Sequence, residues 1–397
     1  MSQFLSFEDH LADDFWLNLY SLKQKLNDEC IHCIQHLRFA ESNESRQFLI
    51  VIIKQLIEKL EYIPCSQHPT SEPFEEFSIV DRRSWQNVGF NESEGIFLVK
   101  EPTKFIRIRS KRQAQMLTLL TKIYELLIEN KFSTKRAIFY DEKDIFQKQS
   151  MVTELIDDIC CILKVNRFKV HIHSSSKGLI FGDVTIVLND NEEISCNNMA
   201  NGTNIPTKIN EITKLTSSAK FVLLVEKDSC FQRLLNSNFC KFLPAIIITG
   251  KGFPDSNTRE MVRLLWEFLR VPILALVDAD PFGIEIMFTY RYGSLSMAFE
   301  NQRLATTQIK WLGIHPSDIV KFAIPQNALK QFDDCDFARL RSLRERPYVK
   351  ENPFFDQQLA LLGHLKHKAE IECFNAFGFD YLTEFFIRGK IKYGGWI

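Results

Sequence analysis

The sequence lacks a long hydrophobic run, and its charges of opposite sign nearly cancel. The chain has 397 residues and a net charge of -1, and its most apolar stretch, Phe48–Ile57, is interrupted by Lys54 and Gln55. A membrane-spanning helix needs roughly 18–20 consecutive apolar residues, so we expect no membrane span. Because nucleic-acid-binding proteins often carry a basic excess, any such site here must be a local basic patch.

The sequence also lacks a recognisable secretion signal and the cysteine pattern of a disulfide framework. No basic segment followed by an apolar one stands at the N-terminus, so we expect a protein that is not secreted. The 10 cysteines are scattered, which favours reduced thiols inside a cell. Cys30, Cys33 and His36 resemble half of a zinc site, but no second Cys/His pair follows at a suitable spacing.

The composition is that of an ordinary globular protein, with 45% hydrophobic and 25% charged residues. The length allows two to three domains. Residues 11–63 show helical spacing of apolar side chains, and a polar, proline-containing linker follows at residues 64–73. We therefore expect residues 1–100 to form an N-terminal helical region with a linker.

Residues 113–190 combine helical patterns with two strand patterns. Apolar residues recur at helical spacing in Met116–Leu127 and in Val152–Leu163, and strands are predicted at Phe168–Ile172 and Val184–Leu188. Three helices followed by a two-stranded ribbon are the plan of a winged helix-turn-helix, a module that commonly docks on duplex DNA. A helical domain with a hairpin and no role in DNA binding fits the same pattern.

A different pattern follows the Asn-rich, irregular stretch 191–215. Continuous apolar runs at Phe221–Val225, Ala245–Thr249 and Ile273–Val277 predict strands buried on both faces. Helical patterns lie between these runs, as in the βαβ units of a parallel sheet. We expect an α/β domain over residues 216–397.

Acidic residues follow two of these predicted strands. Glu226 follows the first strand, and Asp278 and Asp280 follow the third. Ligands bind at the carboxyl ends of the strands in an open parallel sheet. Three carboxylates at one edge repel one another unless a hard cation neutralises them, and Mg²⁺ suits such oxygen ligands. Helix N-caps or solvated loop residues are the alternative for each acid.

Basic residues mark several places where phosphate can be bound. Lys251 lies between two glycines after the second strand, where close backbone approach suits a phosphate, although the spacing is not that of a P-loop and predicts no nucleotide hydrolysis. Lys104, Arg107 and Arg109 form a cluster without an intervening acid. A second basic run either contacts phosphate or forms a solvated helix face; it consists of Arg339, Arg341, Arg344 and Arg346.

Tyr140 ends the segment Lys135–Tyr140 and is a candidate nucleophile toward a phosphodiester. A free tyrosine has a pKa of about 10, so it needs assistance. Arg136 lies four residues earlier and, on a helical turn, can favour the phenolate or hold a phosphate. A buried aromatic ring with a satisfied hydroxyl is the ordinary alternative for any tyrosine.

The order of these motifs resembles one family, the meiotic DNA double-strand-break transesterases, which are eukaryotic relatives of the A subunit of archaeal DNA topoisomerase VI. The resemblance covers roughly residues 100–397, and the first hundred residues carry no comparable signal. The matching segments are Lys135–Tyr140, Ser174–Leu179, Phe221–Asp228, Ile248–Asp255, Leu276–Ile286, Trp311–Gly313 and Lys392–Ile397.

The resemblance implies an α/β multidomain protein. A winged-helix (CAP-like) DNA-binding domain at residues 101–190 would carry the catalytic tyrosine, and a Toprim domain with a parallel sheet and a C-terminal helical extension would occupy residues 216–397. The catalytic residues it implies are Tyr140 and Arg136, the Mg²⁺ ligands are Glu226, Asp278 and Asp280, and the expected DNA contacts are Lys177, Lys251, Lys104, Arg107 and Arg109.

The resemblance also implies an activity and partners. Each tyrosine attacks one DNA strand and leaves a 5′-phosphotyrosyl link with a free 3′-hydroxyl, so that a homodimer makes a staggered double-strand break that starts meiotic recombination. In this family the tyrosine of one protomer works with the metal site of the other. We expect a chromosome-associated protein of the nucleus. Its partners would be double-stranded DNA, a topoisomerase VI B-like subunit bound by the N-terminal helices, and other meiotic break factors.

Two departures from the family pattern and three alternatives remain. An acid usually follows the arginine of the tyrosine motif, where this chain has Ala137, and Phe282 stands where histidine is frequent. A hydrolytic Toprim nuclease would use the acids but not Tyr140. A DNA-binding scaffold would use neither, and a topoisomerase proper would reseal the break.

Overall fold

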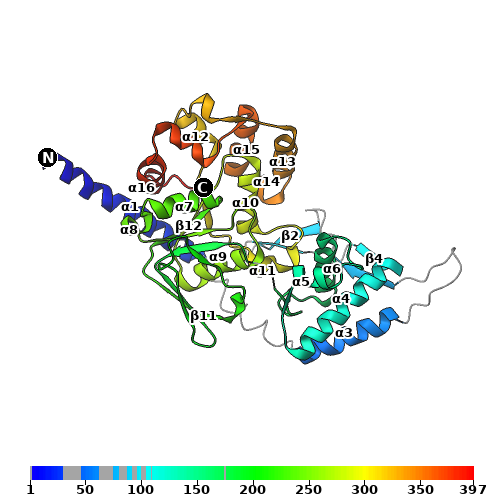
Figure 1. The fold of residues 1–397 in the computed structure, drawn as a ribbon. Helices are drawn as coiled ribbons and strands as arrows, with labels where there is room; N and C mark the ends of the chain where they lie inside the picture. Colours follow the sequence, from blue (N-terminus) through cyan, green and yellow to red (C-terminus); the bar gives the residue numbers. More distant parts are fainter. Residues whose placement is uncertain are drawn as a thin grey trace. The chain divides into compact units, whose positions relative to one another are not determined.

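The protein forms two compact units in a computed structural model (Figure 1). The α/β unit comprises Met1–His32, Ser176–Gly293 and Arg303–Ile397, and the helical unit comprises Cys33–Ser175 and Ser294–Gln302. No helix in the described part of the chain is long and apolar enough to cross a membrane. The structure describes residues 2–29, 46–61, 75–79, 87–91, 96–99, 104–108, 110–173 and 176–397.

The described residues of the helical unit form four main helices and three pairs of short strands. The strand pairs are antiparallel for β1 with β4 and for β2 with β3, and parallel for β5 with β6. The helices are α3 (Arg46–Glu61), α4 (Ser110–Glu129), α5 (Lys135–Asp141) and α6 (Gln149–Leu163). The strands are β1 (Glu75–Ile79), β2 (Val88–Asn91), β3 (Ile96–Val99), β4 (Lys104–Ile108), β5 (Ser133–Thr134) and β6 (Ile172–His173).

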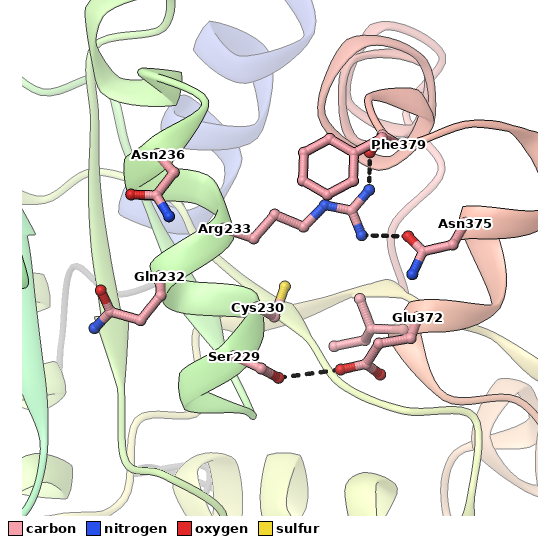
Figure 2. A pocket seen from close by; sticks show the side chains of 9 residues that line it. Ser229, Cys230, Gln232, Arg233, Asn236, Glu372, Asn375 and Phe379 are labelled. Atoms are coloured by element: carbon pink, nitrogen blue, oxygen red, sulfur yellow. Dashed lines mark hydrogen bonds between the residues drawn. The ribbon is translucent and has the colours of Figure 1, made fainter.

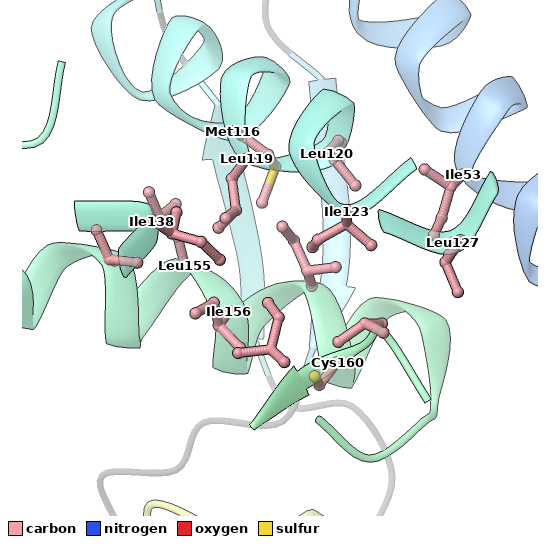
Figure 3. Close-up of a cluster of buried hydrophobic side chains, with 14 of the residues drawn as sticks. Ile53, Met116, Leu119, Leu120, Ile123, Leu127, Ile138, Leu155, Ile156 and Cys160 are labelled. Atoms are coloured by element: carbon pink, nitrogen blue, oxygen red, sulfur yellow. The ribbon is translucent and has the colours of Figure 1, made fainter. Parts of the chain in front are cut away.

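The apolar faces predicted for α4 and α6 meet in the core of this unit (Figure 3). Met116 and Ile123 of α4 pack in one cluster with Ile156 of α6, and all three are fully buried. Ile138 brings α5 into the same cluster. Because truncation of such a side chain to alanine costs about 2–5 kcal/mol, this core fixes the position of the short α5.

The predicted two-stranded ribbon after α6 is wrong. β6 is reduced to two residues and pairs with β5. β7 (Leu179–Gly182) instead joins the large sheet of the α/β unit, antiparallel to β13 (Ala245–Thr249), and β8 (Val184–Leu188) pairs with strands of a separate three-stranded sheet. A strand pattern specifies a half-buried surface but not the partner, so tertiary packing decided the pairing.

The centre of the α/β unit is a six-stranded sheet with the strand order β10-β7-β13-β12-β14-β15. The last four strands in this order are parallel, and every residue of β12, β13 and β14 is buried, as predicted. The remaining strands of this sheet are β12 (Phe221–Val225), β14 (Ile273–Leu276), β15 (Ile309–Gly313) and β10 (Thr203–Asn204).

Two parts of this unit differ from the sequence prediction. β15, for which no strand was predicted, forms the edge of the sheet. The stretch 191–215, predicted to be irregular, contributes β10 and two strands that pair with β8, namely β9 (Glu193–Ser195) and β11 (Ile212–Ser217). Polar residues face solvent on these short strands, so the apolar runs used for prediction are missing there.

The helices of this unit include the N-terminal helix α1 (Ser2–Glu29), which packs against α16 (Ile387–Lys392) near the C-terminus. Phe15, Leu19 and Leu22 are buried on α1, and the Asn18 amide donates a hydrogen bond to the Lys392 carbonyl. Other helices of the unit are α7 (Asp228–Asn236), α8 (Phe239–Phe242), α9 (Ser256–Leu269), α10 (Pro281–Tyr292), α12 (Pro316–Lys321), α13 (Asp334–Arg344), α14 (Pro347–Lys350) and α15 (Pro353–Leu365).

A buried polar network ties α16 to the edge of the sheet. The Lys390 ammonium donates to His315 Nδ1 at 2.9 Å and to Asp318 at 3.0 Å, and His315 Nε2 lies 2.9 Å from the Trp311 carbonyl. Burial, reinforced by Lys390, lowers the pKa of His315 to about 4. Neutral histidine is therefore the form that stabilises this packing.

We predict that protonation of His315 destabilises the fold in mild acid. Its folded pKa lies below the usual 6.5, so its contribution is present above pH 6.5 and is lost as the pH falls toward 4. Between pH 7 and pH 5 the wild type should lose about 2 kcal/mol more stability than His315→Asn. Denaturant unfolding at both pH values measures this, and equal losses in the two proteins would contradict it.

The N-terminus of α5 has an N-cap residue but lacks the acidic side chain that completes a capping box. The Thr134 hydroxyl accepts a hydrogen bond from the Ala137 N–H at 3.1 Å, which satisfies one of the free donors of the first turn. Ala137 occupies the third helical position, where an acid can reach back to the backbone of the cap residue. Ala137 is exposed, so the missing acid leaves no buried cavity.

We predict that Ala137→Asp stabilises α5 by about 0.5–1 kcal/mol, because it completes the capping box and places a negative charge at the helix N-terminus. Hydrogen exchange of the α5 amides should slow accordingly. Ala137→Asn is the matched control without the charge and should give a smaller effect. Unchanged or faster exchange in Ala137→Asp would show that the cap does not limit this helix.

Candidate active site

The register of the parallel strands places Glu226 beside Asp278. β12 and β14 are neighbours, with Val225 opposite Leu276, so both acids follow at the same edge of the sheet. The Asp278 N–H donates a hydrogen bond of 2.9 Å to Glu226 Oε2. The structure thus brings together two residues that lie 52 positions apart in the sequence.

Burial makes a negative charge at this edge unfavourable. Glu226 is 9% exposed and Asp278 is 2% exposed. Burial, followed by repulsion from Asp278, raises the pKa of Glu226, and burial also raises the pKa of Asp278 and of Asp280. Carboxylates that are buried this close together favour a cation as a neighbour.

Asp280 serves as the N-cap of α10. Its Oδ1 accepts a hydrogen bond of 2.6 Å from the Gly283 N–H, so the N-cap alternative for this acid describes part of its role. A Cβ atom at Gly283 would lie 2.7 Å from Glu226 Oε2 and 2.8 Å from the Asp278 carbonyl. Glycine is therefore required for the helix start to approach both acids so closely.

Lys227 occupies the space beside Asp278 and was not identified as a site residue from the sequence. Its ammonium lies 2.8 Å from Asp278 Oδ2, 3.1 Å from Glu372 and 3.4 Å from Glu370. The other Asp278 oxygen accepts a hydrogen bond of 2.8 Å from the Ile371 N–H. The sequence signals that could have identified this group are a lysine directly after Glu226 and two glutamates two positions apart, Glu370 and Glu372.

The acids have the right chemistry for a hard cation, but their arrangement is incomplete. Carboxylate oxygens are the ligands that Mg²⁺ prefers. Across the described residues, no group of three His, Cys, Asp or Glu side chains is placed to hold a metal ion. Both oxygens of Asp278 already have partners, namely the Lys227 ammonium and the Ile371 N–H.

The glycine-containing loop after β13 lies next to these acids. The Gly252 N–H donates to the Glu226 carbonyl at 2.9 Å. Lys177 is exposed, and its ammonium donates to the Lys251 carbonyl at 3.2 Å while its backbone N–H donates to Asp255 at 3.0 Å. Two predicted DNA-contacting lysines, far apart in the sequence, therefore meet at the loop that holds Glu226.

The structure describes the remaining basic and zinc candidates to different extents. Lys104 and Arg107 lie on β4, for which the structure describes the backbone pairing alone, and Arg109 lies outside the described residues, as do the zinc candidates Cys30, Cys33 and His36. Most of the second basic run forms ion pairs: Arg339 and Arg346 with Glu285, and Arg344 with Asp356.

Tyr140 lies near the end of α5 in the helical unit and is 50% exposed. The Lys143 ammonium lies 4.6 Å from the centre of its ring, and the Arg136 guanidinium lies 5.6 Å from it. Two cations over one ring hold it by cation–π attraction. The sequence reasoning identified Arg136 but missed Lys143. Tyr140 is therefore accessible to a substrate, unlike Tyr290, which is buried.

An open pocket of about 310 Å³ lies between α7 and the segment after Glu370 (Figure 2). Ser229 donates a hydrogen bond of 3.1 Å to Glu372, and Arg233 donates one of 2.6 Å to Asn375. Glu372 lines this pocket and also contacts Lys227. These contacts hold the C-terminal segment against the helix that follows Glu226.

Comparison with known proteins gives two family matches and several relatives. The Toprim-domain family of Spo11 and the A subunit of topoisomerase 6 matches residues 221–391, and the family "Type IIB DNA topoisomerase" matches residues 111–172. Human meiotic recombination protein SPO11 is 43% identical over 327 residues, which cover 81% of this chain and 83% of the relative.

Two further relatives, one from a plant and one from mouse, extend this similarity. The A subunit of DNA topoisomerase 6 from Arabidopsis thaliana is 35% identical over 326 residues, covering 81% of this chain and 76% of the relative. The mouse meiotic recombination protein SPO11 is 42% identical over 327 residues, covering 81% of this chain and 83% of the relative. The family matches fall on the two units that carry the tyrosine and the acids. The chain belongs to the family of topoisomerase VI A subunits and Spo11 proteins.

Proposed function

We propose that this protein is a topoisomerase-like DNA transesterase that makes the double-strand breaks of meiotic recombination. The observation that carries the proposal is an accessible tyrosine, flanked by two cations, in the same chain as a buried set of acids at the edge of a Toprim sheet. The human relative is named as a meiotic recombination protein. Within the proposal, the helical unit acts as the winged-helix DNA-binding domain.

The proposed chemistry is a direct exchange of phosphoester bonds. Tyr140 Oη forms a bond to the phosphorus and gives up its proton, while the bond from phosphorus to the 3′-oxygen breaks and that oxygen takes a proton. The product is a 5′-phosphotyrosyl link with a free 3′-hydroxyl. The positive charges of Arg136 and Lys143 lie beside the Tyr140 ring and would help to hold the substrate phosphate.

The proposed cofactor is a divalent cation, and we assign it as Mg²⁺. Glu226, Asp278 and Asp280 would hold it, and the Lys227 ammonium lies 2.8 Å from one of the Asp278 oxygens. When bound, the ion would supply stabilisation of the charge that develops on the phosphate. Burial raises the pKa of Glu226 and of Asp278, so a nearby cation would favour their ionised forms.

The proposed substrate contacts follow from the basic residues. Lys177 and Lys251 stand at the loop that holds Glu226 and would bind the DNA backbone through a salt-dependent, sequence-independent attraction. Lys104, Arg107 and Arg109 keep the same assignment. The active state would be a homodimer on double-stranded DNA in the nucleus, associated with chromosomes.

The proposed protein partners are meiotic break factors, among them a topoisomerase VI B-like subunit. The N-terminal helices are assigned to this B-like subunit. The outer face of α1 is consistent with this assignment because it exposes Leu17 at 61% and Tyr20 at 60%, three residues apart. Helical spacing of this kind places both side chains on one face.

Covalent capture tests the proposed nucleophile. The tagged protein is isolated from meiotic cells under denaturing conditions that strip non-covalent contacts, and attached DNA ends are labelled. We predict that wild type retains DNA and that Tyr140→Phe retains none, because it lacks the attacking oxygen. Tyr393→Phe is the matched control, since Tyr393 is also exposed, and it should retain DNA.

The alternatives give other results in the same experiment. DNA bound by neither wild type nor Tyr140→Phe, with breaks still forming in both, would overturn the proposal in favour of a hydrolytic nuclease. Normal breaks in an Asp280→Asn strain would favour a scaffold without activity of its own. If the breaks disappear with time in cells that lack repair factors, the protein itself reseals them, as a topoisomerase does.

A further inference from the structure

We propose that Lys227 is a built-in cation that holds Asp278 in the metal-free protein and is displaced from it when a divalent ion binds. The inference rests on the proposed function, because it concerns the ion assigned to the same acids. It adds a positioning residue that competes with the metal for one ligand.

The contacts of Asp278 carry the first step of the argument. The Lys227 ammonium lies 2.8 Å from Asp278 Oδ2, and the Ile371 N–H donates a hydrogen bond of 2.8 Å to Asp278 Oδ1. An ion that approaches Oδ2 of Asp278 therefore meets a lysine ammonium that is already in place. The Ile371 bond comes from the backbone and can remain, because a carboxylate oxygen accepts more than one contact.

The second step is that Lys227 has other carboxylate partners besides Asp278. Its ammonium also lies 3.1 Å from Glu372 and 3.4 Å from Glu370. A partly buried lysine that lost its sole partner would carry a large desolvation cost. With two further carboxylates within reach, Lys227 can leave Asp278 and remain paired, so the exchange needs no large rearrangement.

The third step is that Glu370 and Glu372 are themselves held in place. Ser229 donates to Glu372 at 3.1 Å, and Lys330 pairs with Glu370 at 2.5 Å. Residue 369 also pairs with Ala279, between the two site aspartates, through a pair of backbone hydrogen bonds. The receiving carboxylates thus stay beside the metal ligands.

The test is direct binding of Mn²⁺ to the purified full-length chain, followed by the electron paramagnetic resonance signal of the free ion. We predict that Lys227→Met binds Mn²⁺ about tenfold more tightly than wild type, because it frees Asp278 and removes a positive charge next to the ion. Lys227→Arg keeps the charge and should bind like wild type. Lys330→Met is the matched control, which removes a nearby charge without touching Asp278, and should change affinity by less than about twofold.

A double-mutant cycle separates competition from a structural role. Glu372→Gln should weaken Mn²⁺ binding about threefold in the wild-type background, since Lys227 then depends more on Asp278. In the Lys227→Met background the same substitution should have almost no effect. An equal loss in both backgrounds would mean that Glu372 acts on the ion without Lys227 and would overturn the inference.

The remaining outcomes distinguish this inference from the proposed function. Wild type that binds Mn²⁺, loses binding in Glu226→Gln and gains nothing in Lys227→Met would overturn the role of Lys227 alone. No Mn²⁺ binding by wild type or by Lys227→Met would overturn the metal assignment and this inference together. Weaker binding in Lys227→Met, with an unchanged melting temperature, would show that Lys227 supports the metal instead of competing with it.

Discussion

The hydrogen-bonded register between β12 and β14 is the constraint on which the site depends. It sets Val225 opposite Leu276 and so brings Glu226, one residue later, and Asp278, two residues later, to the same edge of the sheet. Both strands are fully buried, so a shift in register would disturb the packing of two layers of side chains. The energy of the core therefore holds two like charges together that would otherwise move apart.

The charge brought together in this way explains much of the surrounding structure. Glycine at position 283 lets the start of α10 approach both acids, and the loop of Lys251 and Gly252 bonds to the backbone of Glu226. Lys227 neutralises part of the charge and is itself held by glutamates of the C-terminal segment. The site is thus a balance of charges in which an incoming cation changes the partner of a lysine.

The sequence predicted those parts of the molecule that depend on local pattern. Long apolar runs identified β12, β13 and β14, and helical spacing identified α4 and α6, because burial on both faces or on one face leaves a clear period. Glu226 and Asp278 were predicted to meet because strand ends share an edge. The partners of β7 and β8 were not predictable, since pairing is decided by tertiary contacts.

Lys227, Glu370 and Glu372 were missed for a similar reason. Their meeting depends on the backbone pairing of Ala279 with residue 369, about 90 positions away, and no local pattern announces it. Lys143 was missed because its position over the Tyr140 ring depends on the turn after α5. Residues that act through a partner distant in the sequence can be identified only once the fold is known.

In the proposed active homodimer, Tyr140 of one protomer would work with the acids of its partner, and mixing two inactive chains tests this proposal most directly. Chains with Tyr140→Phe and chains with Asp280→Asn are expressed together in meiotic cells, with different tags, and DNA attached to each is measured after denaturation. In the mixed dimer, one site then has an intact tyrosine from the Asp280→Asn chain and intact acids from the Tyr140→Phe chain. The account predicts DNA attached to the Asp280→Asn chain alone, and only when both chains are present. DNA on neither chain would contradict it, because tyrosine and acids would then have to come from the same protomer.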